Sequence, residues 1–472
     1  MEDHVMRVLQ LLQEGKITSA EAEALISALK GEPAKAATPP PAPEAPPKAA
    51  PFMEDFAAKL KTPKIEFDLE HLGERISKAV SKVQPEKIVA RVQAQLRTAT
   101  RASASWGAVV SAKVKSWTDG IDVRPLNSAS LPESIETHTA EFHLESGAAL
   151  LVENPLGNVV VRPAEGATAT VSYKRIVWGA TEGLKQLADS IVVDHFATDS
   201  RLDVKVSAPD HFRDGVVDLE ISIPSISSVR ASTHFGDVVI EGLSGRIEAV
   251  TTTGVLTLKN LEGDVRGETT IGAIKLDSIA GTATVASEGG AIEANQVSKG
   301  LSANSVSGDV TVMNVEGGRV ECKSVSGDVS VTGVGLEAPL DIVVESVSGD
   351  AALTNASGNV AIKAVSGDVL ADKLSANRVQ AQAVSGDVRV RIDSAFSGTL
   401  HANTVSGDVS LALSADTNAR VSMTTASGDL RCDHNAQEVV ATETLWSGVI
   451  GTGAGTINVQ TISGDSHIVE VG

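Results

Sequence analysis

The stretch Ser305-Val306-Ser307-Gly308-Asp309-Val310-Thr311-Val312 decides the fold, because its central Ser-Gly-Asp returns along the last third of the chain. The spacing is about 19 residues, and a fixed period of this length is typical of one supersecondary unit stacked many times. We therefore expect a mainly β protein, a parallel β-solenoid with about 19 residues per rung. Right-handed coiling is expected by analogy with parallel crossovers. The eight copies begin at Ser307, Ser326, Ser348, Ser366, Ser385, Ser406, Ser427 and Ser463.

The valines and the tripeptide have different expected roles. Side chains alternate across a strand, so Val306, Val310 and Val312 are expected to share the buried face. If the alternation continues through the tripeptide, Gly308 points into a narrow corner. If the chain bends there, glycine supplies a backbone conformation that other residues disfavour. The outward residues form the candidate interaction ladder: Ser307, Asp309, Ser326, Asp328, Ser348, Asp350, Ser366, Asp368, Ser385, Asp387, Ser406, Asp408, Ser427 and Asp429.

Weaker copies of the tripeptide extend the series. They are Phe235-Gly236-Asp237, Glu262-Gly263-Asp264 and Ser357-Gly358-Asn359. Early in the array, glycines also recur at half the period, which predicts two similar halves in each rung, each a short strand plus a corner. We place the solenoid repeats at residues 231–472.

The aspartates of successive rungs are expected to form a column with a spacing of about 5 Å. Like charges at this distance repel by roughly 1 kcal/mol per pair in water. The column must therefore be exposed, partly neutralised, or bonded to turn amides. Calcium is one candidate neutraliser, but the calcium-binding β-roll repeats a denser Gly-Gly-x-Gly-x-Asp pattern. We expect no metal and no cofactor.

Composition and motif searches both argue against an enzyme. The formal net charge is −20, and residues 231–472 carry 14 basic against 29 acidic side chains, so we expect no nucleic-acid partner. Aromatic residues make up only 3% of the chain, which argues against a sugar-binding cleft, and we expect no small-molecule substrate. No phosphate loop and no nucleophile elbow is present. A repeated serine without a neighbouring base is no nucleophile.

Four segments precede the repeats. Residues 1–30 are expected to form a helical hairpin and residues 31–51 a Pro/Ala-rich linker. Residues 52–118 are expected to form basic amphipathic helices, and residues 138–230 an irregular β entry region with one short helix.

The basic helices have two functional interpretations besides that of ordinary packing helices with a solvated face. They could lie on an anionic membrane, or dock on an acidic surface, including this protein's own solenoid. Neither a secretory signal nor an apolar run of about 20 residues is visible, so a cytoplasmic location is expected, with peripheral membrane contact as an option. The candidate contact residues are Arg75, Lys78, Lys82, Lys87, Arg91, Trp106 and Trp117.

Two stretches resemble a bacterial family. Leu151-Val152-Glu153-Asn154-Pro155-Leu156-Gly157-Asn158-Val159, followed by the Ser-Gly-Asp series, resembles the putative-adhesin family of β-strand-repeat proteins, a domain of unknown function. Leu12-Gln13-Glu14-Gly15-Lys16-Ile17-Thr18-Ser19-Ala20-Glu21-Ala22 is similar to the short helical hairpin that precedes this domain in LiaX-like envelope-stress proteins. The resemblance implies a non-catalytic β-solenoid, linked in some members to envelope stress or surface binding.

These observations together predict a non-enzymatic scaffold or binding protein. It would present a repetitive acidic Ser/Asp face to protein partners, with N-terminal helices for self- or partner association. Two alternatives remain open: a bactofilin-like polymerising cytoskeletal scaffold, and an adhesin-like surface protein.

Overall fold

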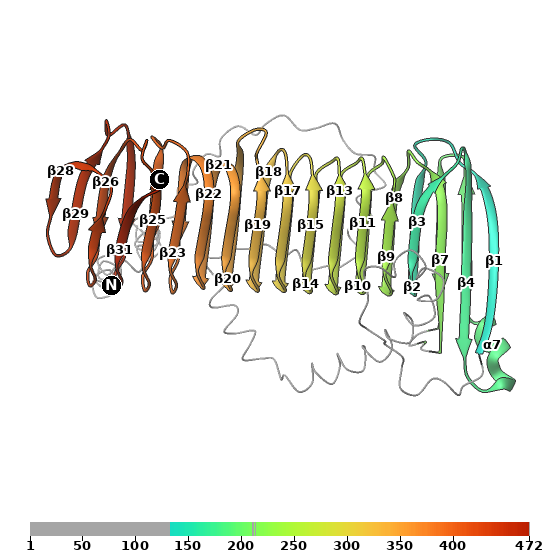
Figure 1. Ribbon diagram of the computed structural model, residues 1–472. Helices are drawn as coiled ribbons and strands as arrows, with labels where there is room; N and C mark the ends of the chain where they lie inside the picture. Colours follow the sequence, from blue (N-terminus) through green and yellow to red (C-terminus); the bar gives the residue numbers. More distant parts are fainter. Residues whose placement is uncertain (1–132, 210–211, 213, 472) are drawn as a thin grey trace, which may run out of the picture. The chain divides into compact units, whose positions relative to one another are not determined.

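The computed structural model describes residues 133–471 except 210, 211 and 213, all within the compact unit Gln84–Gly472. Each rung has two strands and two corners (Figure 1). In one rung β16 (Leu301–Ser307) is followed by β17 (Val310–Val315), and in the next β18 (Arg319–Ser326) is followed by β19 (Val329–Val334). β16 pairs in parallel with β18, and β17 with β19. The predicted parallel β-solenoid is therefore confirmed, while its right-handed sense stays a prediction.

The first strands of the rungs form one ladder, called sheet 1, and the second strands form another, called sheet 2. β21 (Ala351–Ser366) and β22 (Val369–Gln382) run through a corner and belong to both. Sheet 1 also contains, in spatial order, β5 (Val192–Thr198), β6 (Arg201–Ser207), β2 (Ala149–Leu156), β8 (Ser228–Phe235), β10 (Ile247–Thr253), β12 (Val265–Ile271), β14 (Ala283–Gly289), β16, β18, β20 (Leu340–Ser348), β24 (Thr399–Asn403), β30 (Gly455–Gln460), β26 (Ala419–Thr424), β29 (Leu445–Ile450) and β28 (Ala436–Ala441). Sheet 2 also contains β1 (Glu133–His143), β4 (Thr168–Trp178), β7 (Gly215–Pro224), β3 (Val159–Ala164), β9 (Val238–Glu241), β11 (Leu256–Leu261), β13 (Ile274–Ile279), β15 (Ile292–Val297), β17, β19, β23 (Val388–Ile392), β25 (Val409–Ser414), β31 (Ser466–Val471) and β27 (Leu430–Cys432).

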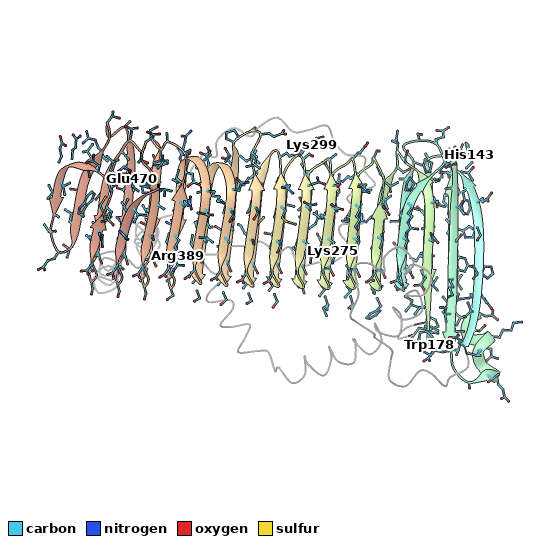
Figure 2. The ribbon with its side chains drawn as sticks, in the orientation of Figure 1. His143, Trp178, Lys275, Lys299, Arg389 and Glu470 are labelled. Carbon is cyan, nitrogen blue, oxygen red and sulfur yellow. The ribbon has the colours of Figure 1, made fainter. Side chains whose placement is uncertain are left out.

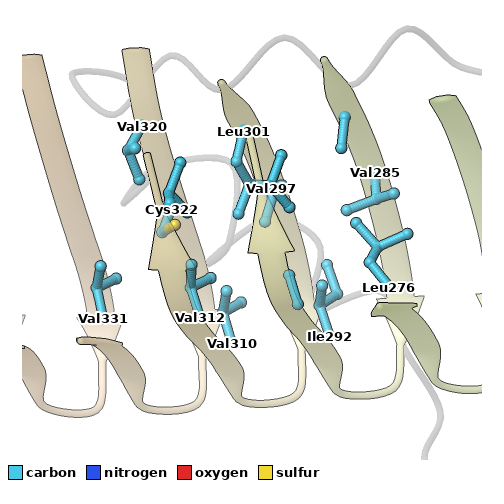
Figure 3. Packing of buried hydrophobic residues seen from close by; sticks show 14 of the residues in the cluster. Leu276, Val285, Ile292, Val297, Leu301, Val310, Val312, Val320, Cys322 and Val331 are labelled. Atoms are coloured by element: carbon cyan, nitrogen blue, oxygen red, sulfur yellow. The ribbon is translucent and has the colours of Figure 1, made fainter. Parts of the chain in front are cut away.

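The core lies between the two sheets and consists of stacked aliphatic columns (Figure 3). Val310 pairs with Val329 and Val312 with Val331, and all four side chains are fully buried. Because successive side chains of a strand point to opposite faces, every second residue enters this core. Small β-branched residues suit the narrow space between two sheets that continue over many rungs.

Antiparallel strands close the N-terminal end. β1 pairs with β4 and β4 with β7, while β5 pairs with β6. The parallel ladder begins inside the predicted entry region, because β2 pairs with β8 and β3 with β9. The expected short helix is present as η1 (Thr181–Gly183) followed by α7 (Leu184–Asp189).

The C-terminal rungs do not follow the order of the sequence. β30 lies between β24 and β26, and β31 lies between β25 and β27. The last Ser-Gly-Asp therefore stacks between the two copies that precede it in the chain, and Ser463 bridges to both Ser406 and Ser427. The antiparallel hairpin of β28 and β29 extends sheet 1 beyond β26, because β29 pairs with the edge of β26.

The chain bends at the corner glycine, which corrects the expected alternation of side chains. Ser305 is fully buried, whereas Val306 points outward and is half-buried. At Gly367, φ is +155°, and an added Cβ would overlap the carbonyl oxygen of Gly349 in the preceding rung. Glycine is thus required for both of the expected reasons, backbone conformation and close approach.

Two of the three weaker tripeptide copies lie at the opposite corner. A Cβ on Gly263 would meet Gly245, and one on Gly358 would meet Leu340, so both glycines sit between the second strand of one rung and the first strand of the next. Only Gly236 belongs to the main column, beneath Gly254. The two halves of a rung are therefore similar in sequence but form different corners.

The expected hairpin, linker and basic helices at residues 1–30, 31–51 and 52–118 lie outside the described residues. Among residues 133–471, apart from the three omitted positions, no helix is long and apolar enough to span a membrane.

We predict that Gly367→Ala lowers the free energy of unfolding by at least about 2 kcal/mol, because the new side chain needs both a disfavoured φ and a displaced neighbouring rung. Denaturant unfolding of the full chain measures this loss. Gly183→Ala is the control: Gly183 has a φ of −105° and no atom within 4 Å of an added Cβ. Equal midpoints for Gly367→Ala and the unmodified chain would contradict the role of the glycine column.

Candidate interaction surface at the Ser-Gly-Asp corner

The structure brings the predicted serines and aspartates together in one continuous row, here called the corner ladder. It follows the corner between the first and second strands of the rungs. All the predicted serines are exposed, as are most of the aspartates; Asp368 and Asp387 are half-buried. Consecutive aspartates along the row are separated by 18 to 22 residues through Asp408. In Figure 2, Arg389 lies beside this ladder and Lys299 at the opposite corner.

Except for Asp429, which ends the row, each aspartate carboxylate of the corner ladder accepts a hydrogen bond from the backbone of the next rung. Asp309 Oδ1 accepts from the N–H of Asp328 at 3.0 Å, and Asp328 Oδ1 accepts from the N–H of Asp350 at 2.8 Å. The same bond continues up the stack through Asp368, Asp387, Asp408, Asp465 and Asp429. Bonding to turn amides was one of the three expected ways to tolerate the acidic column.

A second ladder, which the sequence analysis missed, lies inside the corner. The hydroxyl of Ser305 donates to the carbonyl of Gly290 at 3.2 Å, and that of Ser324 donates to Gly308 at 3.0 Å. The available signal was a serine or threonine three residues before most corner glycines. Equivalent bonds are made by Thr233, Thr251, Thr269, Ser287, Ser346, Thr404, Thr461 and Thr425.

The first rungs use variants of this arrangement. Asn158 Oδ1 accepts from the N–H of Asp237 at 2.8 Å, and the side chain of Asn158 donates to the buried Asp218 at 3.0 Å. Burial raises the pKa of Asp237, although the N–H of Val255 opposes this shift. Asn158 belongs to the stretch that resembles the adhesin-type family, so the resemblance includes the residue that starts the ladder.

The outward groups of the corner ladder are unevenly neutralised. Arg389 contacts Asp368 Oδ2 at 3.2 Å and Asp387 Oδ2 at 2.6 Å. The carboxylates of Asp309, Asp328 and Asp350, by contrast, form no ion pair with any described residue. The serine hydroxyls of the tripeptides also make no hydrogen bond within the described part of the chain. These groups are the ones that remain available to a partner.

An aliphatic column runs beside the serines. It consists of the residue that precedes the tripeptide in each of four neighbouring rungs. This position was expected to be buried, on the pattern of Val306. Val365, Val384, Val405 and Ile462 are instead 41%, 48%, 45% and 57% exposed. The corner therefore presents parallel rows of aliphatic, hydroxyl and carboxylate groups.

Other candidate chemistry is sparse. No group of three His, Cys, Asp or Glu side chains within residues 133–471, omitted positions aside, is placed to hold a metal. Cys322 and Cys432 are free thiols, and burial raises the pKa of Cys322 to about 12. The predicted contact residues Arg75, Lys78, Lys82, Lys87, Arg91, Trp106 and Trp117 lie outside the described residues.

The stacked parallel rungs define a β-repeat solenoid protein, and a family model specifies it further. The chain belongs to the Toastrack DUF4097 family, whose model matches residues 217–399 and 394–469. This confirms the resemblance to a β-strand-repeat family of unknown function. A model of the SHOCT-like domain matches residues 4–34, which overlap the expected hairpin.

Similar solved structures share little sequence with this chain. A "putative cell adhesion protein" from Clostridium sporogenes is 8% identical, with 71% of this chain and 100% of that one covered and a TM-score of 0.14. A "putative adhesin" from Bacteroides fragilis is 11% identical, with 71% and 97% covered and a TM-score of 0.19. A "putative lipid binding protein" from Parabacteroides distasonis is 11% identical, with 71% and 96% covered and a TM-score of 0.23. No curated protein matches the chain.

We predict that Ser324→Ala lowers the free energy of unfolding by about 1 kcal/mol, because it removes the donor to the Gly308 carbonyl. The exposed Ser326, two residues further on, is the matched control, and Ser326→Ala is expected to change stability by less than about 0.5 kcal/mol. Denaturant unfolding of both variants measures the difference. If both serines are equally dispensable, the inner ladder does not stabilise the corner.

The aspartate ladder predicts opposite results for two substitutions at one position. Asp328→Ala leaves the N–H of Asp350 without its acceptor and is expected to cost about 1 kcal/mol. Asp328→Asn keeps an acceptor oxygen and removes one charge from the column, so stability is expected to stay level or rise, most clearly at low salt. Thermal unfolding at two salt concentrations compares them, and an equal loss in both variants would refute the hydrogen-bond account.

Proposed function

We propose that this protein is a non-enzymatic β-solenoid scaffold whose corner ladder binds a protein partner through a row of basic side chains. One observation carries the proposal: Asp309, Asp328 and Asp350 occupy consecutive rungs and use one carboxylate oxygen for the fold. All three residues are exposed, and the second carboxylate oxygen of each forms no ion pair with a basic side chain of the described residues. Each rung therefore offers one acceptor at a spacing of about 4.8 Å.

The repetition suits a polyvalent and modest interaction. A single exposed ion pair contributes only about 0.2–1 kcal/mol, so several rungs have to act together to give useful affinity. A rigid ladder favours this, because its acceptors are already in place before the partner arrives. The acidic row repels phosphates, which favours protein over nucleic acid as the partner.

The N-terminal segments complete the proposal. Residues 1–30 and 52–118 are proposed to mediate self- or partner association, with residues 52–118 also suited to peripheral membrane contact at a cytoplasmic membrane surface. A role in the cell-envelope stress response agrees with the resemblance to LiaX-like proteins. Antiparallel strands end both sheets at the N-terminal side and sheet 1 at the C-terminal side, which favours a capped scaffold over bactofilin-like end-to-end polymerisation.

The proposal predicts binding of a ten-residue probe peptide with lysine at alternate positions, measured by fluorescence anisotropy with the full chain. Replacing Asp309, Asp328 and Asp350 together by Asn should weaken binding about 10-fold, because three exposed ion pairs are lost while the backbone hydrogen bonds remain. The control removes the same charge near the opposite corner through Glu316→Gln, Glu337→Gln and Asp341→Asn. Equal losses in the two triple variants would reduce the effect to net charge, and a chain that does not bind the peptide would refute the proposal.

A further inference from the structure

The outer face of sheet 1 changes character towards its C-terminal end. In the earlier rungs this face carries ion pairs, such as Arg230 with Glu248 at 3.3 Å and Lys323 with Glu345 at 3.1 Å. Over the rungs of β22, β24, β30 and β26 the central outward positions carry no acidic or basic side chain apart from one histidine. We call these positions the amide face, represented by Gln380, Gln382, Asn403, Asn458, Gln460 and Thr424.

The amide face is regular. Gln382 pairs in register with Asn403, Asn403 with Gln460, and Gln460 with Thr424. The strands of these rungs have five or six residues in sheet 1, and each rung spans about eight residues from the arginine edge to the corner serine; four such rungs at about 4.8 Å give an area near 500 Å². Such a patch differs from the rest of this chain, whose formal net charge is −20.

Opposite charges border the two edges of the amide face. Arg378 begins the sheet 1 part of β22, and Arg420 is the second residue of β26. Both are exposed, and neither forms an ion pair with a described residue. At the other edge, beyond the aliphatic column of Val384, Val405 and Ile462, the strands end at the aspartates of the corner ladder. The rung of β26 thus begins with Arg420 and leads to the exposed Asp429.

This pattern is self-complementary. Consider a second copy related by a two-fold axis that lies in the contact plane and runs parallel to the stacking direction. This rotation turns the amide face of the second copy towards that of the first and reverses the direction of its strands. It therefore places the arginine edge of each copy against the aspartate edge of the other. Elsewhere the acidic surfaces of two copies repel each other, whereas the amide face itself adds no like charge to the contact.

We propose that two copies of this chain dimerise face to face through the amide face, with Arg420 of each copy against Asp429 of the other. The buried area is about 1,000 Å² over both copies, the lower bound for a specific interface, so the dimer is a reversible one. The proposal is independent of the basic partner proposed above, because that partner is assigned to Asp309, Asp328 and Asp350, whereas the dimer contact uses Asp429 at the far end of the corner ladder. Asp429 ends the ladder and its carboxylate bonds no described residue, so it can be replaced without breaking the column.

Sedimentation velocity of the full chain between about 1 and 100 µM at low salt tests the dimer. We expect a concentration-dependent dimer whose Kd rises at least 10-fold in the variant carrying both Gln382→Glu and Asn403→Asp, since like charges then meet across the two-fold axis. Adding the same charges away from sheet 1, with Gln186→Glu in α7 and Gln296→Glu in β15, is the control and should leave Kd within 2-fold of the unmodified chain. A monomer at every concentration overturns the proposal and leaves the face to a partner of another kind.

A charge exchange identifies the orientation. Arg420→Glu is expected to raise Kd at least 5-fold, and combining it with Asp429→Arg should restore dimerisation, because the pair is then re-formed with reversed signs. If the double variant is no better than Arg420→Glu alone, the proposed orientation is wrong. If the Glu/Asp variant of the amide face dimerises as well as the unmodified chain, association takes place elsewhere and the proposal is overturned.

Discussion

The structure depends on how one peptide group at each corner obtains its hydrogen bonds. Where the chain bends between the two strands, the carbonyl of the glycine and the N–H of the following aspartate are not paired by backbone groups of adjacent rungs. A buried hydroxyl from the next rung satisfies the carbonyl, as Ser324 does for Gly308, and a carboxylate from the preceding rung satisfies the N–H, as Asp309 does for Asp328. Buried backbone groups need such partners, so the same residue types return in most rungs.

This constraint separates structural from functional roles within the repeat. Glycine is fixed by close approach to the preceding rung, and one oxygen of each aspartate is fixed by an amide. Three groups take no part in these contacts: the exposed serine hydroxyl, the second carboxylate oxygen and the aliphatic column. Function is therefore expected in rows of such groups and in the outer face of sheet 1, where nothing in the corner dictates the side chains.

Much of the fold could be predicted from the sequence, because the period of Ser-Gly-Asp reports parallel stacking directly. The outward direction of Val306 could not, since alternation fails where Gly308 turns the chain. The insertion of the last rung between the two preceding ones could not be predicted either, because the tripeptides at Ser427 and Ser463 are identical. Only the longer gap between these two copies indicated a departure from regular stacking. Most side chains of the candidate ladder are exposed, although Asp368 and Asp387 are half-buried. The buried hydroxyls beneath them were not predicted, because a serine or threonine in the repeat gives no sign of which face it occupies.

Hydrogen exchange at single amides tests the side-chain ladder most directly. The account predicts that the N–H of Asp350 is protected in the unmodified chain, exchanges faster in Asp328→Ala, and keeps its protection in Asp328→Asn, while the neighbouring strand amides are unchanged. Fast exchange of this amide in the unmodified chain, or the same rate in both variants, would contradict the claim that carboxylates complete the corner.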